Sequence, residues 1–372
     1  MLTEQPTVLV QLRYRHVDED RISQELRTCE IRLGYDHVDT LNKLHELGSI
    51  FLDQGRYKSA EAMFRRSIFG LQKFHPNNYS SILQALDCLG EVLTCQGFYE
   101  DAEEVHQNTF RSRRKMLGRK DVSTLASMNN LSITFKHQGR WNEAEELDMQ
   151  VMETRKRVLG AEHRDTLTSM GNLASTYRSL GRLEEAEELE VYVMETFQTV
   201  LGAEHPDALT SVNNLASTYG EQGRWKEAEK LKVRVTEIFK RVLGVEHPDT
   251  LTVMGSLALM YRTLERWKEA ADLDKQVMMI GGRVLGAEHP STLTSMANLA
   301  STYRNLERWK EAEELGVKVI ATRTKMLGAE HPYTLTGKSN LASTYRNQGR
   351  WKEAEELNMQ VTETRKRLVG TC

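Results

Sequence analysis

Histidine recurs at a fixed interval in this sequence, and histidine is the side chain best suited to bind a metal or move a proton near neutral pH. Copies stand 42 residues apart, so neighbouring copies lie a full repeat from one another and cannot share one ion. Proline follows most of them, and proline is favoured in the first turn of a helix. We therefore interpret the series as helix caps and predict no metal site: His163, His205, His247, His289 and His331.

Clustered carboxylates are the next candidates for chemistry. The runs Glu143-Ala-Glu-Glu and Glu185-Ala-Glu-Glu could supply paired acids and bases. Both runs fall early in an expected helix, where negative charge is favourable, and between apolar positions, so we expect them to face solvent. The sequence holds no Gly-x-x-x-x-Gly-Lys-Ser/Thr, His-Glu-x-x-His or Gly-x-Ser-x-Gly motif. We predict no catalytic residues, no enzyme activity and no cofactor.

Two further series are suited to holding a peptide. Amide side chains can bridge backbone groups, and guanidinium groups hold carboxylates through paired hydrogen bonds. The alternative, that the amides only bond neighbouring helices and the cations are ordinary solvated charge, stays open. The amide series, which we call the asparagine ladder, consists of Asn130, Asn172, Asn214, Asn298 and Asn340, and Ser256 interrupts it. The cationic series, which we call the cation ladder, consists of Lys136, Arg178, Arg262, Arg304 and Arg346, and Gly220 interrupts it.

Composition limits the partners. The 50 basic and 53 acidic residues give a net charge of −3, so neither nucleic acid nor an anionic membrane is an expected partner. No run of 18 apolar residues occurs, so we predict no membrane-spanning segment. The four cysteines have no regular spacing, which is typical of buried thiols in a reducing compartment, and we expect a cytoplasmic protein.

These residues are positioned by an internal repeat. Leu-Gly recurs every 42 residues from Leu117 to Leu327, and a leucine and an alanine series follow the same period through the chain. Each unit contains two apolar stripes of helical spacing, separated by glycine, and no strand pattern. Residues 36–372 are thus predicted to form eight tandem helix pairs, the first two degenerate, after an N-terminal segment, 1–35, with one leading helix. The predicted fold is an all-α, right-handed α-solenoid superhelix of antiparallel helix pairs.

The repeat resembles a known family. The pattern Leu-Ala-x-x-Tyr-x-x-x-Gly-x-Trp-x-x-Ala, as in Leu215 to Ala228, is similar to the tetratricopeptide repeat. The 42-residue length, with Asn-Asn-Leu-Ala and Leu-Gly-x-x-His-Pro-Asp, resembles the kinesin light chain variety over residues 21–369. Glu265 and Glu307 stand where that pattern has glycine, and the heptad coiled coil of kinesin light chains is missing, so motor association is not implied. The resemblance implies that first helices line a concave groove, with both ladders facing into it.

We therefore predict a non-catalytic interaction scaffold or adaptor that binds an acidic protein or peptide segment in this groove. The alternative is a sensor arm of a NOD-like signalling ATPase, suggested by the near-identity of Leu299–Leu315 and Leu341–Leu357, which match at 15 of 17 positions. An RNA-binding array is disfavoured, because positions that would read bases hardly vary between repeats. The last helix keeps the apolar residues of internal copies, so self-association through it is also expected.

Overall fold

The computed structural model describes residues 8–370, with side chains from 18 to 367. Within that range the chain forms α-helices and no strand, so the architecture is the all-α repeat solenoid that the sequence predicts. The helices are α1 (Val8–Leu33), α2 (Val38–Asp53), α3 (Tyr57–Phe74), α4 (Tyr79–Cys95), α5 (Tyr99–Leu117), α6 (Val122–His137), α7 (Trp141–Leu159), α8 (Arg164–Ser179), α9 (Leu183–Leu201), α10 (Pro206–Glu221), α11 (Trp225–Val242), α12 (Pro248–Thr263), α13 (Trp267–Val284), α14 (Pro290–Asn305), α15 (Trp309–Leu327), α16 (Pro332–Asn347) and α17 (Trp351–Gly370).

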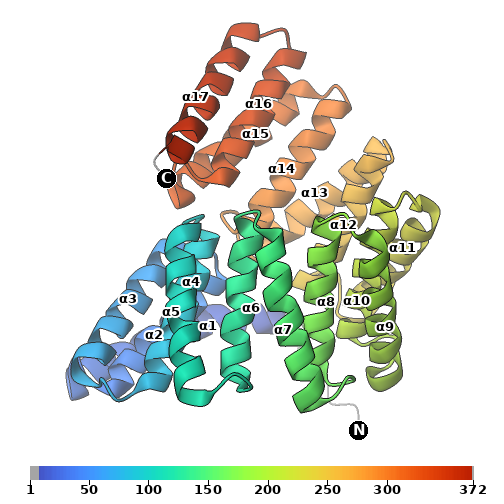
Figure 1. Cartoon of the computed structure of the whole chain (residues 1–372). Helices are drawn as coiled ribbons and strands as arrows, with labels where there is room; N and C mark the ends of the chain where they lie inside the picture. The colour runs from blue at the N-terminus through green and yellow to red at the C-terminus, as the bar shows by residue number, and fades with distance from the viewer. Residues whose placement is uncertain (1–7, 371–372) are drawn as a thin grey trace. The chain divides into compact units, whose positions relative to one another are not determined.

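Each repeat consists of an even-numbered first helix and an odd-numbered second helix. Contacts divide the chain into two compact units, residues 13–238 and a second unit that includes 239–372, with the division inside α11. In each unit successive helices pack side by side, for example α4 to α9 and α12 to α17 (Figure 1). Small residues permit the close approach: Ala144, Ala186 and Ala312 are at most 1% exposed where the second helices meet their neighbours.

The histidine series caps the first helices, as the sequence analysis inferred. The Nδ1 atom of His163 accepts a hydrogen bond from the backbone N–H of Asp165 at 3.1 Å, and the four later histidines make the same bond. This bond satisfies one of the backbone donors that a helix start leaves unpaired. His37 caps α2 in the same way, which extends the series to the first repeat.

The turn between the two helices of a repeat requires a left-handed residue. Glycine supplies it at most repeats, as at Gly181 with φ 75°. At the two repeats where glycine is replaced, Glu265 and Glu307 adopt the same conformation, with φ 58° and 60°. A side chain at such a position costs energy that glycine avoids, so these two turns are strained relative to their equivalents.

A polar clamp joins several second helices to the segment that follows the next first helix. Glu187 on α9 accepts hydrogen bonds from Gln222 Nε2 and Arg224 Nη1, both at 2.8 Å, just after α10 ends. Glu103 and Glu313 bind the matching glutamine and arginine of their own successors, and Glu145 binds Arg182 alone. The acidic runs therefore do more than face solvent, because Glu145 is only 18% exposed and holds two repeats together.

The leading helix α1 takes the position of a second helix directly before the first complete repeat. Glu19 on α1 holds the clamp position, since it accepts from Gln54 Nε2 at 2.9 Å and from Arg56 Nη1 at 2.7 Å. Ile22 and Leu26 are buried in the same core as α2 and α3. This is the leading helix expected in the N-terminal segment, 1–35, and it runs from Val8 to Leu33. None of the helices in the described range has an apolar stretch long enough for a bilayer.

Candidate partner-binding site

The asparagine ladder lies on the first helices, directly before a buried leucine in each repeat. Asn172 on α8 donates from Nδ2 to Asn129 Oδ1 of α6 at 2.7 Å, so this asparagine bonds the neighbouring first helix, as the open alternative proposed. The side chains of the other ladder members make no hydrogen bond to any described residue, so their amides remain available: Asn130, Asn214, Asn298 and Asn340.

The structure brings the two ladders together at the junction of successive first helices. Lys136 Nζ at the end of α6 donates to the backbone carbonyl of Asn172 on α8 at 3.1 Å. The same relationship recurs in the other unit, where Arg304 Nη1 donates to the carbonyl of Asn340 at 3.3 Å. The cation of one repeat thus lies beside the asparagine of the next, and both ladders share one face of the first helices.

Three of the five ladder cations are neutralised from behind by a carboxylate of their own second helix. Lys136 Nζ lies 2.8 Å from Asp148, and Arg262 Nη1 lies 2.6 Å from Asp274. Arg178 Nε lies 3.8 Å from Glu190, and the Arg178 side chain is 19% exposed. The acids are at most 3% exposed. Such pairs weaken the attraction of the cation for an incoming anion, so these three ladder positions offer less positive charge to a partner.

The buried carboxylates form a series that the sequence analysis missed. Each follows its cation by 12 residues and also accepts a hydrogen bond from a threonine of the next repeat, as Asp274 does from Thr302 at 3.0 Å. Burial raises the pKa of Asp274, and the neighbouring Arg262 guanidinium opposes that shift. The signal was present in the sequence as acidic residues in the 42-residue register on the face of the second helix that is otherwise apolar.

The repeat that lacks a ladder cation carries the charge on the other helix. Gly220 stands at the cation position, and Lys232 occupies the position of the buried acid. Lys232 Nζ donates to Asn213 Oδ1 at 3.3 Å and to Ser217 Oγ at 2.9 Å. Burial, with the nearby Arg178 guanidinium, lowers the pKa of Lys232 to about 8. This lysine is buried behind the first helix, so it does not restore a charge to the face.

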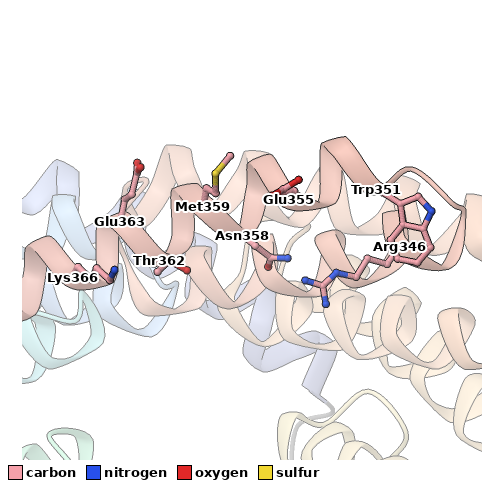
Figure 2. Close-up of a pocket in the computed structure, with 8 residues that line it drawn as sticks. All are labelled: Arg346, Trp351, Glu355, Asn358, Met359, Thr362, Glu363 and Lys366. Atoms are coloured by element: carbon pink, nitrogen blue, oxygen red, sulfur yellow. The ribbon is translucent and has the colours of Figure 1, made fainter.

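Arg304 and Arg346 differ from the other ladder cations because no acid stands behind them. Their second helices carry Gly316 and Asn358 at the acid position. Arg304 is half-buried, with Nη2 3.3 Å from Ser301 Oγ, and burial lowers the pKa of its guanidinium. Arg346 is exposed near the C-terminal end of α16 (Figure 2). Neither guanidinium forms an ion pair with a described residue, so the positive charge of the face is concentrated in the last two repeats.

Other reactive groups do not assemble into a centre. Burial raises the pKa of the Cys88 thiol to about 12 and of the Cys95 thiol to about 11, so both stay protonated and unreactive at neutral pH. Between residues 18 and 367 no three His, Cys, Asp or Glu side chains converge as metal ligands would.

Comparison with protein families identifies the repeat. The tetratricopeptide repeat model matches residues 81–153, 134–190, 207–280 and 293–367, and a second tetratricopeptide model matches residues 40–68. The chain belongs to the tetratricopeptide repeat family. The prediction from the Leu-Ala-x-x-Tyr pattern is thereby confirmed, and tetratricopeptide repeats generally serve as scaffolds for protein interactions.

Several solved structures are similar to this chain. A crystal structure described as a Podosopora anserina putative kinesin light chain with nearly identical TPR-like repeats is 36% identical to this tetratricopeptide repeat protein, over 54% of this chain and 95% of that one, with a TM-score of 0.49. The quorum sensor NprR of B. thuringiensis, in its apo form, shares the fold at 17% identity and a TM-score of 0.57, over 96% of both chains. BtubC (BKLC) of P. vanneervenii shares it at 18% identity and 0.53, over 62% of this chain and 92% of that one. A comparison with curated proteins gives no match.

Proposed function

We propose that this tetratricopeptide repeat protein is a non-catalytic scaffold that binds an acidic protein segment at Arg304 and Arg346. The observation that carries the proposal is the difference within the cation ladder. Lys136, Arg178 and Arg262 face a buried carboxylate, whereas Arg304 and Arg346 do not. An anionic side chain that approaches the face therefore meets unneutralised charge only in the last two repeats.

The asparagine ladder supplies the second half of the site. Asn298 and Asn340 stand on the same first helices as the two arginines, and their amides have both donor and acceptor capacity left. Amides that bond a peptide backbone fix its register, while the arginines select side chains with negative charge. The partner that fits is a segment with two carboxylates placed to reach neighbouring repeats. Each arginine at such a partly exposed position contributes about 0.5–1 kcal/mol.

The experiment uses a fluorescein-labelled, glutamate-rich 12-residue peptide and its glutamine-substituted counterpart as probes. Affinity is measured against salt for the wild type and for the double variant Arg304→Glu/Arg346→Glu. The matched control is Arg157→Glu/Arg365→Glu, which makes the same charge change at two exposed arginines outside the ladder. We expect the ladder variant alone to lose binding of the acidic probe. Equal loss in both double variants would show that binding depends on overall charge, and the site would be wrong.

The remaining expectations from the sequence stay predictions. The sensor-arm alternative rests on the near-identity of two repeats, and a cytoplasmic location rests on the reduced cysteines. Self-association through α17 would appear as a dimer in sedimentation. It is supported by Trp351 on α17, which is 66% exposed, whereas the equivalent Trp225 on α11 is 37% exposed. The absence of catalysis is part of the proposal, since the described side chains are placed for packing and pairing.

A further inference from the structure

An apolar cleft opens where α4, the first helix of the second repeat, begins between the ends of α3 and α5. The cleft holds about 610 Å³, and Ile82, Leu83 and Leu86 of α4 form its floor. Tyr79 of α4 and Met116 of α5 line it nearer the surface and are 49% and 48% exposed. We call these five residues the second-repeat cleft. Because α4 packs against both α3 and α5, the cleft lies within one compact unit (Figure 1).

The turn before α4 explains why the cleft is apolar. Glycine stands at the position of Pro76 before each of the other even-numbered first helices, and threonine stands at the position of Ile82 in most of them. In the repeat of Gly244 and Thr250, for example, the threonine hydroxyl donates to the glycine carbonyl at 2.8 Å. Ile82 has no hydroxyl to make this bond, and its side chain lines the cleft together with Pro76. The second repeat therefore has an apolar surface where other repeats have a polar contact.

The surroundings of the cleft are strongly basic. Residues 62–86 and 105–120, which form its walls, contain nine lysines and arginines and no acid, in a chain whose net charge is −3. Lys115 lines the cleft, and Lys73 is its equivalent on α3. Neither ammonium group forms an ion pair with a residue from 18 to 367. Lys73 Nζ lies instead 5.6 Å and 4.9 Å from the ring centroids of Phe69 and Phe74, two exposed aromatic side chains.

Later repeats show how a cation at this position is neutralised elsewhere. Lys325 Nζ lies 2.9 Å from Glu288, which precedes it by 37 residues, and Arg283 binds Glu246 at the same spacing. The residue 37 positions before Lys115 is Asn78, which has no charge. The second repeat has thus lost the carboxylate at the same place where it gained the apolar surface. Unneutralised positive charge and exposed apolar area occur together here.

This combination fits an amphipathic helix with acidic flanks, which lays its apolar face in the groove and its carboxylates beside the cations. A bilayer surface fits less well, because the floor residues Ile82 and Leu83 are buried at the bottom of a concave site. A small anionic amphiphile also fits less well. Lys73 and Lys115 stand on two different helices, so matching both requires more than one anionic group.

A second copy of this chain is a poorer occupant than another protein. Its most acidic helices are α7 and α9, with the runs that begin at Glu143 and Glu185. The apolar faces of these helices are already used inside the repeats, since Val151 is 1% exposed and Val193 is 4% exposed. Neither helix can offer an apolar stripe to the cleft without leaving its own core.

We propose that the second-repeat cleft binds an amphipathic, acidic helical segment of another protein, which inserts large apolar side chains between α3 and α5 and places carboxylates beside Lys73 and Lys115. This site is separate from the two ladders. The asparagine-ladder position on α4 is Cys88, nine residues after Tyr79. Nine residues are about 2.5 helical turns, so the two side chains leave α4 on opposite sides.

The test uses the full chain and a fluorescein-labelled, 14-residue helical peptide with leucine and phenylalanine on one face and glutamate on the other. We expect saturable binding that Tyr79→Ala/Met116→Ala and Lys115→Glu each weaken at least fivefold. The matched controls Val158→Ala and Arg157→Glu alter the equivalents of Met116 and Lys115 in the next repeat and should change affinity less than twofold. With a glutamine version of the peptide, Lys115→Glu should lose its effect, whereas Tyr79→Ala/Met116→Ala should keep it.

The proposal would be overturned by a peptide that does not bind, or by controls that weaken binding as much as the cleft variants. Binding of phosphatidylserine vesicles that the cleft variants abolish would assign the surface to a membrane. A dimer in sedimentation that Lys115→Glu dissociates would assign it to a second copy. The double variant Arg304→Glu/Arg346→Glu should bind the amphipathic peptide normally. If it does not, the peptide occupies the cation ladder and the cleft proposal is wrong.

Discussion

The Arg262 guanidinium and the Asp274 carboxylate form an ion pair of 2.6 Å between the two helices of one repeat, and Asp274 is 1% exposed. The pair explains why a cation on the proposed binding face of a first helix need not be available to a partner. It also makes the two residues dependent on each other, because either one alone would leave a charge in a poorly hydrated place.

Removing Asp274 alone should therefore destabilise the protein. We expect Asp274→Ala to lower the free energy of unfolding by about 3 kcal/mol, since it leaves Arg262 unpaired and frees the Thr302 hydroxyl. The double variant Arg262→Met/Asp274→Leu should cost much less than the sum of the two single changes. Urea unfolding followed by circular dichroism measures both, and additive losses would mean that the pair is not coupled.

A carboxylate introduced on the second helix next to Arg304 should weaken the binding of an acidic segment by this arginine. Gly316→Asp adds the missing acid, and the space permits it, because a Cβ at Gly316 would meet Leu341 at an ordinary 3.4 Å. We expect the affinity for the glutamate-rich probe to fall roughly as far as in Arg304→Ala, with the fold retained. The control Gly316→Asn has the same shape without charge. Equal behaviour of the aspartate and asparagine variants would exclude a charge effect.

Stability should fall in mild acid because of His106. Burial lowers the pKa of this imidazole from 6.5 to about 4, and Gly90 leaves room for its ring. The unfolded chain binds the proton near pH 6.5 and the folded chain only near pH 4, so the contribution is complete above pH 6.5 and is lost as pH falls towards 4. The loss is on the order of 3 kcal/mol. His106→Met should remove this part of the pH dependence in urea titrations between pH 4 and 7.

Glycine should relieve the two left-handed glutamates. Glu265→Gly and Glu307→Gly are each expected to raise the free energy of unfolding by about 0.5–1 kcal/mol, because glycine adopts positive φ without the side-chain clash. The converse, Gly223→Glu at an equivalent turn, should destabilise by a similar amount. Thermal unfolding of the three variants compares them directly. A neutral result at both glutamates would show that their side chains compensate for the strain.

The clamp can be measured by using α17 as an internal control. Glu313→Ala removes the acceptor of Gln348 and Arg350 and should cost about 0.5–1 kcal/mol, since the bonds are only partly shielded from solvent. Glu355→Ala, at the equivalent position of the next repeat, should cost nothing in the isolated chain. A comparable loss in Glu355→Ala would reveal a contact that Glu355 makes within the protein.

The repeat period and the residues that cap the helices made most of the fold predictable from the sequence. The 42-residue register located both helices of each repeat, and the histidine series marked where first helices begin. The site was less accessible. The sequence shows Lys136 and Arg262 at equivalent positions of two first helices, as members of a series of cations. Whether each cation can attract an anion depends on Asp148 and Asp274, which lie 12 residues later on the second helices. Distances between side chains on different helices depend on how the helices cross, which spacing along the chain does not give.

The buried-acid position has an evolutionary consequence. A ladder arginine can be withdrawn from recognition, or returned to it, by one substitution on the helix behind it, as the contrast between Asp274 and Gly316 illustrates. The proposed binding surface then keeps its residues while its preference for a partner's charge changes. Duplicated repeats of this kind can therefore diverge in specificity through mutations that an inspection of the exposed face would overlook.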